Sequence, residues 1–77
     1  MKRFYEGFMT YVTIEQRLLN AAGDLRRASA RLEGPGMLKS QIEGALANLD
    51  RALDLARWAK RVALHEWKDA LDARRAA

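Results

Sequence analysis

Apolar residues recur every seven positions along the first half of the chain. One row of this repeat comprises Phe4, Tyr11, Leu18, Leu25 and Leu32, and a second row comprises Gly7, Ile14, Ala21 and Ala28. A heptad with two apolar rows is typical of a helix that packs lengthwise against another helix. The pattern therefore predicts a helix over about residues 2–33, with these two rows as its contact face.

The second half of the chain carries apolar residues at the three- and four-residue spacing of a single helix face. This face comprises Leu38, Ile42, Ala45, Leu46, Leu49, Ala52, Leu53, Ala56, Ala63, Trp67 and Leu71. It predicts a second helix over about residues 37–75. Its alanines would lie opposite larger residues of the first helix and let the two helix axes approach closely.

The only proline lies in the sequence EGPG, residues 33–36, between these two stretches. Gly34 can adopt the left-handed conformation that closes a helix, and Pro35 cannot continue one. We expect the turn at residues 34–36. Because so short a connection makes neighbouring helices antiparallel, the predicted fold is an all-α, antiparallel two-helix hairpin, a single domain over residues 1–77.

Folding the chain at Pro35 predicts which residues meet across the hairpin. The expected pairs are Leu25 with Ala45, Leu18 with Ala52, Ile14 with Ala56, Gly7 with Ala63 and Phe4 with Trp67. In this register Trp67 closes the open end of the hairpin core.

Two stretches of the first helix leave its course open. Thr13 and Gln16 have the spacing of a capping box, so the helix begins either at Lys2 or only at Ile14. Gly23 costs about 1 kcal/mol relative to alanine inside a helix, which makes a kink an alternative to a straight course there.

A further apolar stripe is expected on each helix, on the side away from the hairpin contact. On the second helix it comprises Leu55, Trp58, Val62 and His65, and on the first helix Tyr5, Phe8, Val12 and Leu19. Contiguous exposed apolar residues usually mark contact sites. Arg57 and Arg61 flank Trp58, and tryptophan and arginine are enriched at binding hot spots. We predict an interface here, either with a second copy in a homodimeric four-helix bundle or with another protein.

Chain length and composition strengthen the expectation of a partner. With 77 residues and no cysteine, the chain is too short for a large core and forms no disulfide, so association is the remaining way to bury more surface. The net charge of +4 is spread over interspersed basic and acidic residues. No secretory signal or membrane span is expected, and we predict a cytoplasmic protein without a membrane partner.

No arrangement of residues predicts catalysis. The single histidine, His65, has Asp69 on the same helix face but no further metal ligand in a recognisable spacing. Ser29 and Ser40 lie in no pattern that pairs a nucleophile with a base, and EGPG lacks the GK[ST] ending of a phosphate-binding loop. We expect a protein that is not an enzyme and has no catalytic residue, metal or cofactor.

Two basic clusters make nucleic-acid binding the alternative to protein binding. One cluster comprises Arg26, Arg27 and Arg31, and the other comprises Arg57, Lys60 and Arg61. Affinity for a phosphate backbone grows with the number of phosphates that are neutralised, which favours a continuous basic stripe. Here acidic residues interrupt the clusters, so the sequence favours a protein partner over nucleic acid.

The function expected from these patterns is binding without catalysis. We expect a small adaptor or inhibitor that docks on another protein through an apolar and arginine-rich patch. By analogy alone, small helical proteins without motifs are common among the accessory proteins of phages and other mobile elements, many of which block a host protein. The sequence leaves the identity of the partner open.

Overall fold

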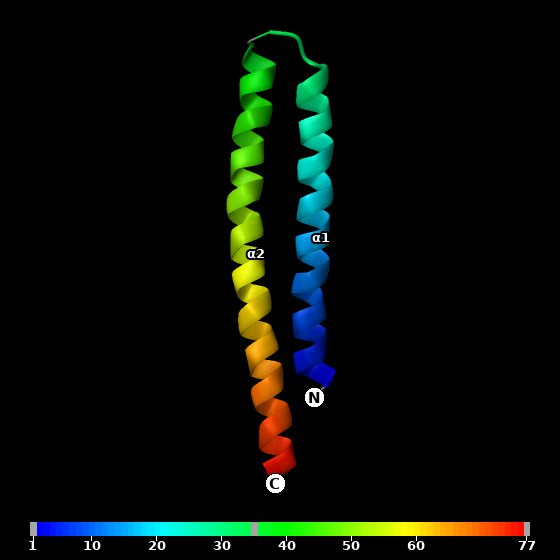
Figure 1. Ribbon diagram of the computed structural model, residues 1–77, viewed down its shortest axis with the longest axis vertical. Coiled ribbons are helices and arrows are strands. Elements are labelled where there is room, and N and C mark those ends of the chain that lie inside the picture. Colours follow the sequence, from blue (N-terminus) through cyan, green and yellow to red (C-terminus); the bar gives the residue numbers. More distant parts are fainter. Residues whose placement is uncertain (1, 35, 77) are drawn as a thin grey trace.

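The chain forms two long helices that lie side by side. The computed structural model describes residues 2–34 and 36–76, with α1 at Lys2–Arg31 and α2 at Met37–Ala76. The helices run antiparallel and are joined at one end by a short connection (Figure 1). The predicted all-α helical hairpin is confirmed, and it measures 63 × 14 × 12 Å.

The connection between the helices begins earlier than the sequence predicts. α1 ends at Arg31, where the amide of Leu32 donates a hydrogen bond of 3.1 Å to the carbonyl of Ser29. Gly34 has a φ of 70°, the left-handed conformation expected of it. α2 starts with a hydrogen bond of 3.0 Å from the amide of Ser40 to the carbonyl of Gly36. Pro35 lies outside the described residues.

The start of α1 and its passage through Gly23 bear on the two open questions about its course. The helix begins at Lys2, because Thr13 does not act as a cap. Its hydroxyl donates 3.1 Å to the carbonyl of Met9 one turn earlier, while the Gln16 amide donates to Asn20. Helical hydrogen bonding continues through Gly23, so this glycine does not end the helix.

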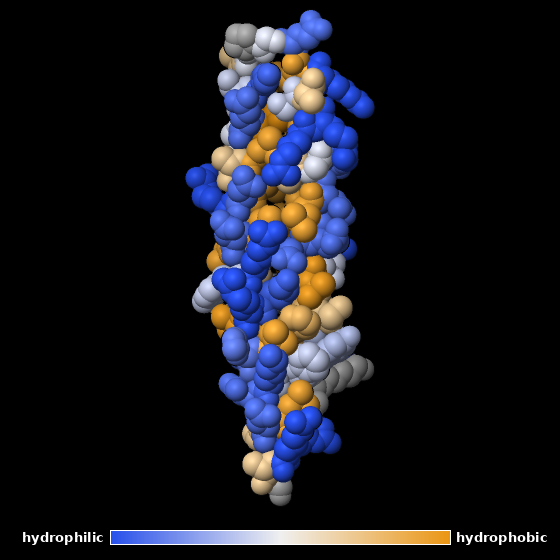
Figure 2. All heavy atoms as spheres, viewed as in Figure 1, coloured by the Kyte–Doolittle hydropathy of each residue, from blue (hydrophilic) through white to orange (hydrophobic). Residues whose placement is uncertain are grey.

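The contact face of α1 is one position away from the predicted one. The row of Tyr11, Leu18, Leu25 and Leu32 is half-buried as expected, but its companion row is Phe8, Glu15, Ala22 and Ser29. The predicted row is wrong at its two central positions, because Ile14 is 38% exposed and Ala21 is exposed beside Ala22, which is 3% exposed. Its outer members, Gly7 and Ala28, are half-buried. We call the contact between the helices the seam; Figure 2 shows hydrophobic side chains gathered along it between hydrophilic ones.

Most of the predicted face of α2 lies in the seam. Leu53 and Ala56 are buried, and Ile42, Ala45, Leu46, Leu49, Ala63, Trp67 and Leu71 are half-buried. Leu38 and Ala52 are exposed, against the prediction. Leu38 is in the first turn of α2 at the closed end, and Ala52 lies at the edge of the seam.

Three of the five predicted cross-helix pairs line a common depression: Ile14 with Ala56, Leu18 with Ala52 and Gly7 with Ala63. The contacts of Glu15 are displaced from the predicted level toward the C-terminus of α2. Folding at residue 35 would place Glu15 opposite residue 55, yet its carboxylate contacts Arg57 and Lys60. Side chains of a helix lean toward its N-terminus. In an antiparallel pair each side chain therefore meets residues nearer the C-terminus of the other helix than those at its own level.

Candidate protein-interaction surface

An aromatic cluster closes the open end of the hairpin. Trp67 packs against Tyr5 edge to face, with ring centroids 5.4 Å apart, and stacks on Phe8 at 6.0 Å. The expected role of Trp67 is confirmed, although its ring partners are Tyr5 and Phe8 rather than Phe4, which is 40% exposed.

These contacts correct the stripe predicted on the outside of α1. Phe8 is in the seam, Val12 is half-buried, and Tyr5 packs on Trp67. Leu19 stays exposed at the seam edge. The prediction that this stripe faces away from α2 is wrong, because the shift of the seam by one position brings it to the edge of the contact.

Charged side chains join the two helices on the side of the seam that carries Tyr5, Val12 and Leu19. Glu15 accepts hydrogen bonds from Lys60 Nζ at 2.9 Å and from Arg57 Nε at 3.2 Å. Toward the closed end, Arg26 and Asp50 approach to 3.7 Å. We call this side of the hairpin the ion-paired flank.

The ion pairs change the acidity of Glu15. The hydrogen bond from Lys60 is the largest cause that lowers the pKa of its carboxyl below the ordinary value of 4.5, and Arg57 adds to the effect, while desolvation opposes it. A polar residue is thus accommodated in the seam, since the long cationic side chains of α2 reach it from the edge.

The opposite side of the seam carries an apolar groove. It is lined by Tyr11, Ile14 and Leu18 of α1 and by Ala52, Leu55, Ala56 and Ala59 of α2, and its volume is about 290 Å³. None of these lining residues is charged. We call this side the apolar flank. It lies opposite the ion pairs because Ile14 is one helical step of about 100° from Glu15, and Leu55 is two steps from Arg57.

The stripe predicted on the outer face of α2 is exposed. Trp58 is 57% exposed and Leu55 is 64% exposed, and Val62 and His65 are also at the surface. Leu55 belongs to both features, since it lines the groove, whereas Trp58 faces away from α1. Arg61 is exposed near Trp58, but Arg57 reaches across the seam to Glu15.

The basic residues predicted for nucleic acid are mostly paired with carboxylates. Arg26 pairs with Asp50, Arg27 with Asp24, and Arg57 and Lys60 with Glu15. Arg31 lies in the last turn of α1. Arg26 and Glu15, the residue that holds Arg57 and Lys60, are eleven positions apart on α1. At a rise of 1.5 Å per residue, the two clusters are about 16 Å apart along the hairpin. They do not merge into one cationic stripe.

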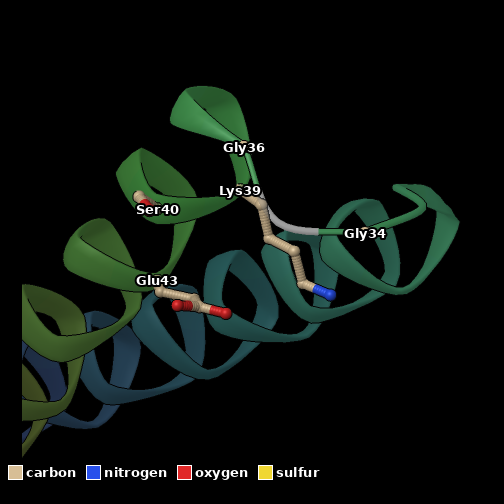
Figure 3. Close-up of a pocket in the computed structure, with 5 residues that line it drawn as sticks. All are labelled: Gly34, Gly36, Lys39, Ser40 and Glu43. Atoms are coloured by element: carbon tan, nitrogen blue, oxygen red, sulfur yellow. The ribbon is translucent and has the colours of Figure 1, made fainter.

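A polar depression lies at the closed end of the hairpin. It is lined by Gly34, Gly36, Lys39, Ser40 and Glu43. In Figure 3 the side chains of Lys39 and Glu43 extend into the same space beside the connection. A charged ligand of either sign would meet a like charge there, so this depression is a weaker candidate site than the apolar flank or the α2 stripe.

Other kinds of site find no support in the described part of the chain. Within residues 2–34 and 36–76, no cluster of three His, Cys, Asp or Glu side chains could hold a metal ion. In the same residues neither helix contains an apolar stretch long enough to cross a bilayer. No family model, curated protein or solved structure matches the chain, so its surface carries the functional conclusion.

Proposed function

We propose that the chain is a small protein-interaction module that docks on another protein through the α2 stripe. The single observation that carries the proposal is the position of Trp58, which is 57% exposed on the face of α2 that makes no contact with α1. A large aromatic side chain left in water gains free energy when a partner covers it. Its neighbour Arg61 adds the second residue type that is enriched at binding hot spots.

The spacing of the stripe indicates how a partner would recognise it. Leu55, Trp58 and Val62 occupy positions i, i+3 and i+7 of one helix, which is the arrangement of anchors that enter an apolar groove on another protein. The expected partner therefore presents an apolar groove with an acidic rim that meets Arg61. The module would act by occupying that groove, as an adaptor or an inhibitor, and not as an enzyme.

Charge pairing favours this function over nucleic-acid binding. A cation that is already held by a carboxylate releases fewer counterions from a phosphate backbone. Four of the six basic residues considered for nucleic acid are paired in this way. The proposal places the module in the cytoplasm, since a chain without cysteine needs no oxidising compartment in which to form disulfides.

The experiment uses two exposed apolar residues of α2 as a matched pair. Trp58→Ala tests the stripe, and Leu38→Ala is the control, because Leu38 is 58% exposed but lies at the closed end. Tagged wild type is recovered from the cells that make the chain, and a captured protein is purified and titrated with all three versions. We expect Trp58→Ala to weaken binding by about tenfold or more, as hot-spot truncations do, and Leu38→Ala to leave it unchanged.

Two results would contradict the proposal. One is equal affinity of wild type and Trp58→Ala for the purified partner. The other is recovery of nucleic acid whose binding weakens steeply with salt and is lost in Arg31→Ala and Arg61→Ala, which would favour the alternative.

A further inference from the structure

The hairpin exposes more surface than a folded chain of its mass usually does. Its accessible surface is 5987 Å², whereas a compact monomer of 8.7 kDa exposes about 4,700 Å². The excess of about 1,250 Å² exceeds the area of about 800 Å² that each partner buries in a standard interface. The radius of gyration of 17.9 Å likewise exceeds the value of about 11.5 Å for a compact chain of this length.

The apolar groove lies at the middle of the hairpin. The midpoint of α1 falls between residues 16 and 17, and that of α2 between residues 56 and 57. The groove is lined by residues 11–18 and 52–59, on both sides of these midpoints. A twofold axis through the groove, perpendicular to the long axis, would therefore align two hairpins over nearly their whole length.

The apolar flank is also self-complementary. In such an antiparallel pair, residues equally far from the α1 midpoint come level with each other, so Ala21 of one copy lies about two residues from the level of Ile14 of the other. Phe4, which is 40% exposed, comes level with Ala28 of the second copy. Leu55 protrudes next to the small residues Ala52 and Ala59, which leave room for a second leucine. A symmetric interface requires this match of large and small residues within one patch.

We propose that the apolar flank binds a second copy of this chain, so that two antiparallel hairpins form a four-helix bundle. The central groove has no charged lining residue, and the ion pairs of Glu15 and Arg26 stay on the outer side of the bundle. Arg3 and Glu66 line the adjoining depression beside Phe4 and would lie toward the end of the interface. Trp58 does not line the groove and remains available to another protein. The dimer and the partner proposed above would both use Leu55, whereas Trp58 belongs to the partner surface alone.

The test compares two leucine-to-lysine variants of similar initial exposure. Leu55→Lys places a charge at the centre of the proposed interface, and Leu38→Lys places one at the closed end. By sedimentation equilibrium we expect twice the 8.7 kDa chain mass for wild type and for Leu38→Lys. For Leu55→Lys we expect the dimer to weaken by about a hundredfold, because a charge replaces a buried leucine.

A cross-linking experiment tests the same interface without placing a charge in it. Since the chain has no cysteine, Leu55→Cys can form a disulfide only between copies, and its place near the twofold axis favours that bond. We expect rapid oxidation of Leu55→Cys to a covalent dimer and slow oxidation of Leu38→Cys. Should Leu55→Lys unfold, the thermal midpoint of wild type must still rise with concentration.

The proposal is overturned by a wild-type monomer at high micromolar concentration with full helix content. It is also overturned by a dimer that Leu55→Lys and Leu38→Lys weaken equally, or by equal oxidation rates of the two cysteine variants. Because Trp58→Ala leaves the proposed dimer intact, failure of the dimer and failure of the α2 stripe are distinguishable.

Discussion

The two flanks of the hairpin seam differ in what holds them. On the ion-paired flank, side chains of the two helices bind each other: Tyr5 packs on Trp67, Glu15 binds Lys60 and Arg57, and Arg26 approaches Asp50. On the apolar flank, Ile14 and Leu55 border a groove and remain exposed. Side chains bridge the two helices on one flank, whereas an open groove separates them on the other.

This difference separates two tasks of a short helical chain. Ion pairs across the seam define how the helices lie against each other, but exposed pairs add little stability. Apolar surface supplies most of the free energy of folding, and among the described residues three apolar ones, Ala22, Leu53 and Ala56, are buried in the single hairpin. The apolar flank keeps apolar surface exposed, and this is the surface that the proposed dimer would bury.

The largest loss of stability is expected at Trp67, which packs on Tyr5 of the ion-paired flank. Trp67→Ala removes the ring that packs on Tyr5 and Phe8, and truncation of such an aromatic residue costs about 3 kcal/mol. Trp58→Ala, at the surface of the same helix, should cost about 0.5 kcal/mol or less. Chemical denaturation at one low protein concentration measures both. Equal losses of stability in the two variants would contradict the inner position of Trp67 and the outer position of Trp58.

A smaller effect is expected from alanines at different depths of the seam. Ala56→Leu overpacks a buried position and should destabilise by about 1 to 3 kcal/mol. Ala52→Leu, at the exposed edge, should cost much less, and Ala47→Leu on the outer surface serves as the control. Thermal unfolding ranks the three variants. A loss at Ala52 as large as that at Ala56 would restore the register predicted by folding at residue 35.

The smallest effect is expected from the ion pair itself and depends on pH. Because the folded pKa of Glu15 is below its ordinary value of 4.5, its ionised carboxylate stabilises the fold above that pH. This contribution is lost as the pH falls through the folded pKa. Wild type should therefore exceed Glu15→Gln in stability at neutral pH, and the difference should vanish in acid. A difference that is constant over this range would exclude the pair as its cause.

Much of the fold can be predicted from the sequence, because two long amphipathic stretches divided by EGPG allow few arrangements of the chain. The outer position of Trp58 and the inner position of Trp67 follow from helical spacing alone. The sequence predicts the seam of α1 one position away from its actual place, since the row through Ile14 is wholly apolar or glycine and the actual row contains Glu15. Apolarity alone does not identify a seam that accommodates a charge paired across the hairpin.

The groove could not be predicted for the same reason. The apolar pattern predicts Ile14 inside the seam and Leu55 on the outer stripe, and so does not bring them to one site. The missed signal is the position of Arg57 and Lys60, three residues apart and able to reach one acidic partner at position 15. With Glu15 in the seam, Ile14 lies on the apolar flank.

The most direct test of the proposed dimer compares the solvent accessibility of methyl groups on the two flanks. NMR with a soluble paramagnetic probe measures this accessibility while the protein concentration is raised. We expect the Ile14 and Leu55 methyl signals to become protected as the dimer forms, while the Leu19 signals on the ion-paired flank keep the same attenuation. Protection that appears equally on both flanks, or on neither, would contradict the account.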